Sequence, residues 1–235
     1  MSETRSMIPV TSSQNNSSDT TSTPPAKLRL AVRGEQPEIF TDIHREEVII
    51  VIWQREISAA LQHSAKVLLA SRPGFQTEIT VTPQNALSNI KKSLGTADQT
   101  ELSEDIAQLT DIFCRLFHLD RAGLRLMALD KTMCPKFHAD RVPCRLLTTY
   151  QGIATEWLPH HLMNHSKLGS GSNGEPDHKS GLFENSVHIK QLSCGEVALL
   201  KGERWKNNKN AGLVHRSPKL SLGESRLLLR LDFIK

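Results

Sequence analysis

The feature that most constrains the fold is a change in the hydrophobic pattern near residue 121. Beyond this point, short apolar segments follow one another, separated by Gly, Pro, Asn and Asp. Short strands with turn residues between them are typical of a β-sandwich, a jelly roll or a barrel. The expected strands cover residues 123–129, 144–150, 155–158, 186–192, 196–201, 212–215 and 226–233.

Residues 27–120 have a different pattern, and we expect them to form a mainly helical region that packs on the barrel. The clearest helix covers residues 99–118, where apolar side chains recur with helical spacing. The continuous apolar run 48–53 is an exception that suits a buried strand. Residues 1–26 are rich in Ser, Thr and Asn, so we expect a disordered N-terminal tail. The barrel itself is expected to span residues 121–235.

Composition restricts the range of partners. The chain of 235 residues has a formal net charge of +4 and only 5% aromatic residues, and no basic run alternates with stacking side chains. We therefore expect no nucleic-acid partner. No apolar run is long enough to cross a bilayer, and residues 1–26 lack the apolar core of a secretory signal. We expect a cytoplasmic protein that has no membrane partner and carries free cysteines.

Three polar residues suggest a metal site. His138 and Asp140 precede the strand expected at 144–150, and residues i and i+2 of an extended chain point to the same side. His215 lies far along the chain, at the end of an apolar strand, so it can join them only if the fold closes on itself. Two histidines and one carboxylate on one face of an ion leave other coordination positions open. This is the facial triad of non-haem Fe(II) oxygenases.

A cation further along the chain completes this pattern. The open positions of such a site accept a 2-oxo acid and dioxygen, and the far carboxylate of the acid then needs a fixed cation. A guanidinium suits this role because it donates two parallel hydrogen bonds. Arg226, at the start of the strand 226–233, is the candidate. Arg230 is the alternative, because it lies on the same face of that strand.

Two resemblances follow from these residues. The stretch HRSPKLSLGESRLLLRLD resembles the last two barrel strands of phytanoyl-CoA-hydroxylase-like and prolyl-hydroxylase-like 2-oxoglutarate oxygenases. The stretches CPKFHADRVPCRLLTTYQGIATEWL and GEVALLKGERWKNNKNAGLVHRSP resemble the bacterial domain-of-unknown-function family numbered 1826. The barrel resemblance implies an α+β fold, a double-stranded β-helix (jelly-roll or cupin-like) barrel with a preceding helical region. It also implies that Tyr150 and Thr155 lie on strands whose residues face the pocket, where either could hydrogen-bond the co-substrate. Ordinary strand packing, with the Tyr150 hydroxyl satisfied at the barrel edge, is the alternative.

Three functions remain open. The first is a hydroxylase dependent on Fe(II) and 2-oxoglutarate, acting on a small-molecule or protein substrate. The second is a non-catalytic zinc or iron site of metal homeostasis, because genes of the resembling family often lie beside zinc-responsive genes. Cys134 as a fourth ligand would favour Zn²⁺ and close the site. The third is a cupin-like interaction domain whose site is vestigial.

The stretch 159–185 is the one part of the barrel region in which apolar residues recur with no clear periodicity. It is rich in Gly, Ser, Asn and His, and we expect a long loop near the mouth of the barrel. It could form a lid. Its histidines, His160, His161, His165 and His178, could also recruit a metal, although such clusters are more often solvated.

Overall fold

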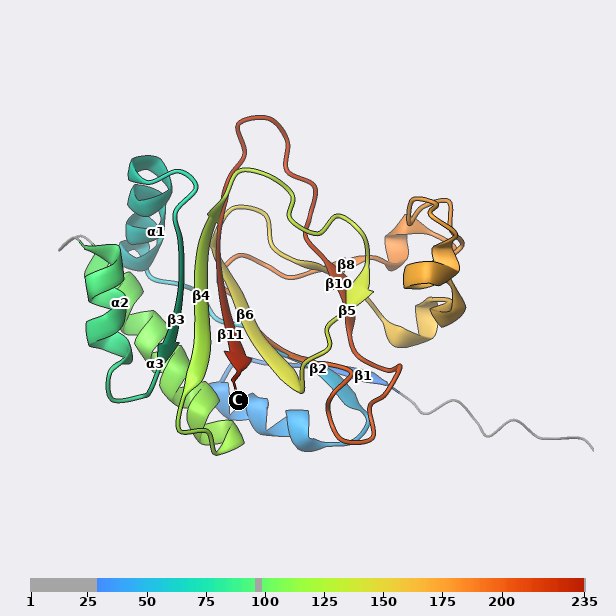
Figure 1. Ribbon diagram of the computed structural model, residues 1–235, viewed down its shortest axis with the longest axis horizontal. Coiled ribbons are helices and arrows are strands. Elements are labelled where there is room, and N and C mark those ends of the chain that lie inside the picture. The colour runs from blue at the N-terminus through green and yellow to red at the C-terminus, as the bar shows by residue number, and fades with distance from the viewer. Residues whose placement is uncertain (1–28, 96–98, 235) are drawn as a thin grey trace, which may run out of the picture.

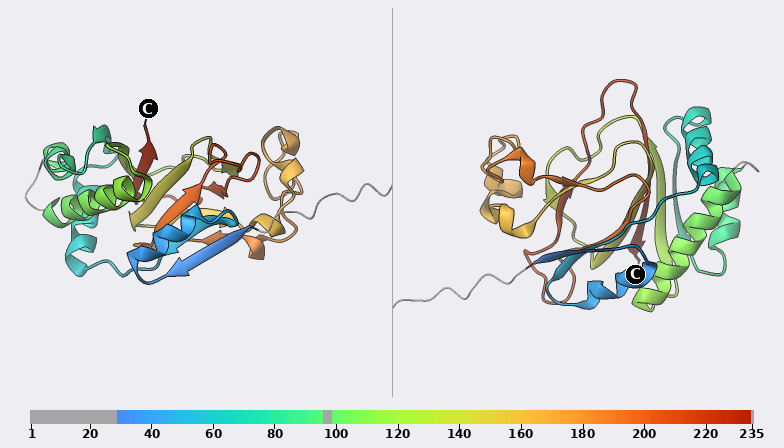
Figure 2. Two further views of the ribbon diagram at one scale, coloured as in Figure 1. Left: turned by 90° about the horizontal axis from the view of Figure 1, so that it is seen from below. Right: turned by 180° about the vertical axis from the view of Figure 1, so that it is seen from behind.

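A computed structural model describes residues 29–95 and 99–234 (Figure 1). The predicted tail 1–26 lies outside these residues. The described chain forms two β-sheets, one of seven strands in the order β1-β2-β9-β6-β11-β4-β3 and one of four strands in the order β5-β10-β7-β8. Helices cover the outer face of the larger sheet, and the smaller sheet faces its other side (Figures 1 and 2).

The strand bounds agree closely with the predicted segments. The larger sheet contains β1 (Leu30–Gly34), β2 (Val48–Trp53), β3 (Gln76–Val81), β4 (Ala122–Leu129), β6 (Cys144–Gln151), β9 (Val197–Lys201) and β11 (Arg226–Phe233). The smaller sheet contains β5 (His138–Ala139), β7 (Glu156–Leu158), β8 (Lys190–Gln191) and β10 (Val214–Arg216). The segment predicted at 186–192 is strand only at β8, because a short 3-10 turn, η6 (Ser186–His188), precedes it.

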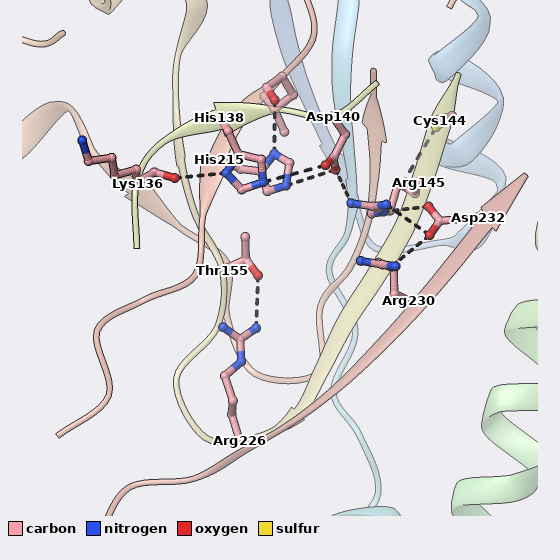
Figure 3. Close-up of polar contacts among 11 residues, drawn as sticks. Lys136, His138, Asp140, Cys144, Arg145, Thr155, His215, Arg226, Arg230 and Asp232 are labelled. Carbon is pink, nitrogen blue, oxygen red and sulfur yellow. Dashed lines mark hydrogen bonds and ion pairs between the residues drawn. The ribbon is translucent and has the colours of Figure 1, made fainter. Parts of the chain in front are cut away.

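The path of the chain confirms the double-stranded β-helix. From β4 onward the chain passes back and forth between the sheets, so that β4, β11, β6 and β9 face β5, β10, β7 and β8. All pairings within these two sets are antiparallel. The space between the two sets is the barrel interior. Polar side chains from β5, β10, β6 and β11 gather at one end of it (Figure 3).

The helices are η1 (Pro37–His44), α1 (Ala59–Ser71), α2 (Ala86–Leu94) and α3 (Thr100–Phe117). Helix α3 matches the helix predicted at 99–118. Its apolar stripe, including Leu102, Ile106 and Phe113, is buried with the outward-facing leucines of β11. None of the described helices has the length and apolar character needed to span a bilayer.

The mainly helical region predicted at 27–120 also contributes strands to the barrel's sheet, of which only the run 48–53 was expected. Strands β1, β2 and β3 all come from residues 27–120, and they extend the barrel's larger sheet at both edges. Strand β3 pairs with β4, and β2 pairs with β9. The sequence of β3, QTEITV, is half polar because one of its faces is exposed at the sheet edge, so it lacks the apolar run that marks β2.

A buried polar network ties helix α3 to the sheet. The Tyr150 hydroxyl on β6 donates to Asp105 Oδ2 of α3 at 2.6 Å. The Arg55 guanidinium donates to both oxygens of the same carboxylate, at 2.5 and 2.9 Å. Because the Asp105 charge is compensated in this way, a carboxylate can lie under the sheet without a large desolvation cost.

We predict that Tyr150→Phe lowers the free energy of unfolding by about 1–2 kcal/mol, because one buried hydrogen bond to a charged acceptor is lost while the ring still packs. Urea denaturation measures the change. The exposed hydroxyl of Ser88 on α2 provides a control, and Ser88→Ala should shift the free energy by less than about 0.5 kcal/mol. Equal stability of Tyr150→Phe and the wild type would contradict the role assigned to this network.

Candidate metal centre

The two histidines of the predicted triad are neighbours across a strand pair. His138 on β5 lies directly opposite His215 on β10. Paired residues of an antiparallel ladder project from the same face, which here is the barrel interior. Their rings lie 4.7 Å apart between centroids. Asp140 follows β5 and turns to the same side, so ligand atoms of all three residues lie within 4.8 Å of one another (Figure 3).

Hydrogen bonds orient both imidazoles for metal binding. His138 Nδ1 lies 3.0 Å from the carbonyl oxygen of Lys136, and His215 Nδ1 lies 3.2 Å from that of Leu213. A carbonyl can only accept, so each Nδ1 donates, and Nε2 is the ring nitrogen left to face an ion. The Nε2 atoms point toward Asp140, at 3.3 Å for His215 and 3.8 Å for His138. Metal-binding histidines are commonly oriented in this way.

The charges of the three groups also suit a cation. Burial, reinforced by the nearby His215, lowers the pKa of His138, which favours the neutral imidazole. Burial by itself would raise the pKa of Asp140, but the hydrogen bond and charge of His215 and the charge of Arg145 hold it below its ordinary range. At neutral pH the site therefore offers a neutral imidazole at His138 and a carboxylate at Asp140, the protonation states that metal ions need.

Arg145 fixes the position of Asp140, a role that the sequence did not reveal. On β6, Arg145 donates through Nη1 to Asp140 Oδ2. Its Nε and Nη2 donate to Asp232 of β11 at 2.7 and 3.1 Å. The carboxylate of Asp140 is thus held through one oxygen and can turn the other toward an ion. The sequence signal that could have revealed this role is an arginine within the strand predicted at 144–150. Whether that arginine faces the interior depends on how this strand pairs with the distant strand β11.

Arg226 lies deep in the barrel, with only 1% of its surface exposed. Its Nη2 donates to Thr149 Oγ1 at 3.0 Å and to Thr155 Oγ1 at 3.1 Å. Its Nε and Nη1 have no hydrogen-bond partner among the described residues. Burial lowers the pKa of Arg226 to about 10, so it remains a cation at neutral pH. Figure 3 shows the guanidinium directed toward the triad, with Thr155 between them.

The placement expected for Tyr150 is wrong. Thr149 and Tyr150 are consecutive residues of β6, so they project to opposite faces of the sheet. Thr149 points into the barrel and binds Arg226, whereas Tyr150 points to α3 and is fully buried there. Thr149 therefore occupies the position by the pocket that the resemblance had implied for Tyr150, and Thr155 lies on the pocket side as expected.

A cavity of about 60 Å³ lies between the triad and the inner face of the larger sheet. Both histidines of the triad reach it, together with Thr155, Arg145 and Arg230. Its remaining lining is Met127, Met133, Cys134, Leu147, Arg216, Ser217 and Leu228. No Asp or Glu side chain is part of this lining, so the surface that a ligand meets is basic and apolar.

Cys134 lies at this cavity but outside the ligand cluster. In the described part of the chain, the only group of three or more ligand atoms close enough to hold an ion comprises His138, Asp140 and His215. The Cys134 side chain is exposed, and its backbone oxygen accepts from Ser217 N. The geometry therefore does not support the closed, thiolate-bearing site that was the alternative.

The segment 159–185 forms an ordered loop beside the triad. It contains three 3-10 turns, η3 (His160–Leu162), η4 (His165–Lys167) and η5 (Gly169–Ser172). Asp177 anchors it, because its carboxylate accepts from Phe137 N at 2.9 Å and from Arg216 at 3.3 Å. The ring centroids of His160 and His165 lie 4.0 Å apart with the rings tilted by 45°, but no loop histidine joins a group of three ligands among the described residues.

A groove of about 610 Å³ separates this loop from β5 and the β9–β10 connection. His138 lines the groove on one side and the cavity on the other. The remaining lining is Ala139, Arg141, His165, Ser166, Leu168, Gly169, Ser170, Glu203 and Asn210. The triad can therefore be approached from the molecular surface through the groove.

The family profile described as "Protein of unknown function (DUF1826)" matches residues 34–232. The chain belongs to this family. The match includes every residue of the triad and both inward-facing arginines of β11. No curated protein matches this DUF1826 sequence.

Several solved structures of 2-oxoglutarate oxygenases overlap with this DUF1826 chain at low identity. The dioxygenase for auxin oxidation 1 from Arabidopsis thaliana, in its 2-oxoglutarate complex, has a TM-score of 0.47 and 12% identity over 88% of this chain and 94% of that chain. The rice dioxygenase for auxin oxidation has a TM-score of 0.48 and 11% identity, over 88% of this chain and 83% of that chain. A Pseudomonas putida prolyl-4-hydroxylase has a TM-score of 0.45 and 10% identity, over 84% and 98%.

In this DUF1826 protein, the backbone around Gly202 packs against the segment that carries Asp140. Its amide donates to Pro143 O at 2.9 Å, and the next amide, of Glu203, donates to Asp140 O at 2.9 Å. A Cβ atom at Gly202 would collide with the backbone oxygens of Val142 and Asp140. Only glycine allows the two segments to approach this closely.

We predict that Gly202→Ala lowers metal affinity by about tenfold or more, because the backbone of Asp140 must shift. Competition between the protein and a chelating dye for Mn²⁺ or Zn²⁺ measures the affinity. Gly34→Ala is the matched control, since its Cβ would meet only the flexible side chain of Ile39, and its metal affinity should not change. Unchanged affinity in Gly202→Ala would show that this contact does not hold Asp140 in place.

Proposed function

We propose that the chain is an oxygenase that uses Fe(II) and 2-oxoglutarate to hydroxylate an organic substrate. The observation that carries this proposal is Arg226, a fully buried cation that has two unpartnered nitrogens and is directed toward a His/Asp/His cluster. An unsatisfied buried donor is costly, so its presence in a native fold calls for a ligand. An anion that also reaches the triad meets this requirement.

The donor set fits iron. His138, Asp140 and His215 supply three ligands from one side, and the opposite side faces the cavity and the groove. An incomplete ligand set of two imidazoles and one carboxylate suits Fe(II), whereas structural zinc sites are usually closed by four protein ligands. The protein would thus leave positions free for a co-substrate and dioxygen.

The surroundings of Arg226 fit the far carboxylate of a dicarboxylic acid. Thr149 and Thr155 both accept from Nη2, which fixes the plane of the guanidinium and leaves the N–H groups of Nε and Nη1 without a partner. Nε and Nη1 donate in different directions, so a carboxylate would take its charge-assisted hydrogen bond from one of them. The absence of Asp and Glu from the cavity lining removes repulsion against a dianion.

The protein's contribution to the reaction is placement and exclusion of water. Arg145 holds the Asp140 carboxylate, and the two backbone carbonyls hold the imidazoles in the tautomer that binds metal. Met127, Leu147 and Leu228 make the cavity wall apolar, which limits access of water to reactive groups. When bound, Fe(II) and 2-oxoglutarate supply the oxidation, in which dioxygen converts a substrate C–H to C–OH and the co-substrate to succinate and CO₂.

The size of the cavity sets one requirement. A volume of about 60 Å³ holds about two water molecules, less than a dicarboxylic acid needs. Co-substrate binding must therefore displace side chains at the mouth. Met133 is suited to this movement because it lines the cavity and is 42% exposed. Side-chain rearrangements of this kind are common on binding.

We predict that the protein purified anaerobically without a tag contains near-stoichiometric iron and that His138→Ala loses it, because only two ligands remain. Elemental analysis of both proteins measures the metal. His165→Ala is the control, since His165 lines the same groove but is outside the triad. Near-stoichiometric zinc that disappears in His138→Ala, without 2-oxoglutarate binding, would instead support the metal-homeostasis function. Unchanged metal content in His138→Ala would exclude the triad as the site.

We predict that Arg226→Met weakens 2-oxoglutarate binding to the Mn²⁺-loaded protein by about ten- to a hundredfold, since charge-assisted hydrogen bonds are lost. Isothermal titration calorimetry measures the dissociation constant, and metal affinity serves as the internal control because Arg226 does not contact the triad. Undiminished 2-oxoglutarate affinity in Arg226→Met, with metal bound, would contradict the assignment.

A further inference from the structure

Strand β11 sends a second guanidinium into the barrel. Arg226, Leu228 and Arg230 alternate with Leu227, Leu229 and Leu231, which pack against the helices. Arg226 and Arg230 are four residues apart on one strand face, so their Cα atoms are separated by about 13 Å. Figure 3 shows them reaching the space beside the triad from different positions along β11.

Arg230 has unused hydrogen-bonding capacity. Its Nε lies 2.9 Å from Asp232 Oδ2, an oxygen that also accepts from Arg145 Nη2. Although it lies close to Asp232, this Nε has no hydrogen-bond partner among the described residues. The side chain is 22% exposed and lines the cavity next to both triad histidines. Arg145, in contrast, uses three of its nitrogens on Asp140 and Asp232.

The arginines that line the cavity differ in how they are paired. Arg145 and Arg216 each donate to two carboxylates. Arg230 shares the carboxylate of Asp232 with Arg145 and keeps a buried Nε without a hydrogen-bond partner among the described residues. An anion that enters the cavity would therefore bind best at Arg230.

The walls next to Arg230 suit hydrocarbon. Met127, Leu147 and Leu228 are buried, belong to the same apolar cluster and line the same cavity as Arg230. A ligand whose charged end is bound by Arg230 would therefore lay its carbon chain along these side chains, near the triad. This places C–H bonds, rather than polar groups, beside the metal site. About 60 Å³ is too small for this chain and the co-substrate together, so the mouth of the cavity must open further when both bind.

We infer that Arg230 binds the carboxylate of the primary substrate, an organic monocarboxylic acid whose hydrocarbon part packs on Met127, Leu147 and Leu228. This inference rests on the proposed function, and it divides the two arginines of β11 between the two organic ligands. Arg226 binds the co-substrate and Arg230 binds the substrate. The groove along His138 provides the route by which the acid enters.

The test is calorimetry on the full chain loaded with Mn²⁺ and saturating 2-oxoglutarate, so that no turnover occurs. Butyrate, hexanoate and octanoate are the probes. We expect wild type to bind at least one of them and Arg230→Met to bind it at least about tenfold more weakly. Arg230→Lys should recover part of the affinity. The affinity for 2-oxoglutarate should stay within about twofold of wild type in Arg230→Met.

Arg115→Met is the control for net charge. Arg115 lies on α3, its side chain is 79% exposed, and it pairs with Asp111 of the same helix. The variant makes the same change in net charge and should leave both affinities unaltered. An equal loss of acid binding in Arg115→Met and Arg230→Met would attribute the effect to overall charge and overturn the inference.

The outcomes separate this inference from the proposed function. If wild type binds 2-oxoglutarate but none of the three acids, or if Arg230→Met binds them as well as wild type, the inference is wrong and the proposed function stands. If Arg230→Met loses 2-oxoglutarate while Arg226→Met retains it, Arg230 is the co-substrate anchor and the inference is again wrong. If wild type does not bind 2-oxoglutarate at all, the proposed function itself fails.

Discussion

The alternation of side chains along β11 is the constraint on which the rest of the structure depends. One face of this strand carries leucines that pack against α3 and hold the helical layer to the sheet. The other face carries Arg226, Arg230 and Asp232, which supply most of the charge inside the barrel. Because β11 pairs with both β4 and β6, a shift of one residue would bury arginine among leucines on one side and empty the site on the other.

The charges inside the barrel are stabilised as a group rather than pair by pair. Arg145 holds both Asp140 and Asp232. Its guanidinium therefore connects Asp140, which follows β5, to the central strand β11. Such a network loses more on partial disruption than on complete removal, because a single missing member leaves a buried charge unpaired. The metal centre and the stability of the sheet are therefore coupled through Arg145.

The triad and Arg226 could be predicted from the sequence because each residue's position on its own strand follows from local spacing. His138 and Asp140 share a side of an extended segment, and His215 and Arg226 lie at the ends of two clear apolar strands. Tyr150 was misplaced, since strand periodicity shows that neighbours alternate but not which of them faces inward. Thr149 and Arg145 were missed for a related reason: their roles depend on pairing with β11, which comes from a distant part of the chain. The polar strand β3 gave no apolar run to detect.

Strand β5 is only two residues long and pairs with β10 alone, at the edge of the smaller sheet. In the proposed metal-bound form, one ion would cross-link this edge strand to its neighbour. Metal binding and the pairing of β5 with β10 would then be coupled in a single equilibrium. The cellular supply of the metal would thus set how long the rim of the barrel stays closed to proteases and to edge-to-edge association with other chains.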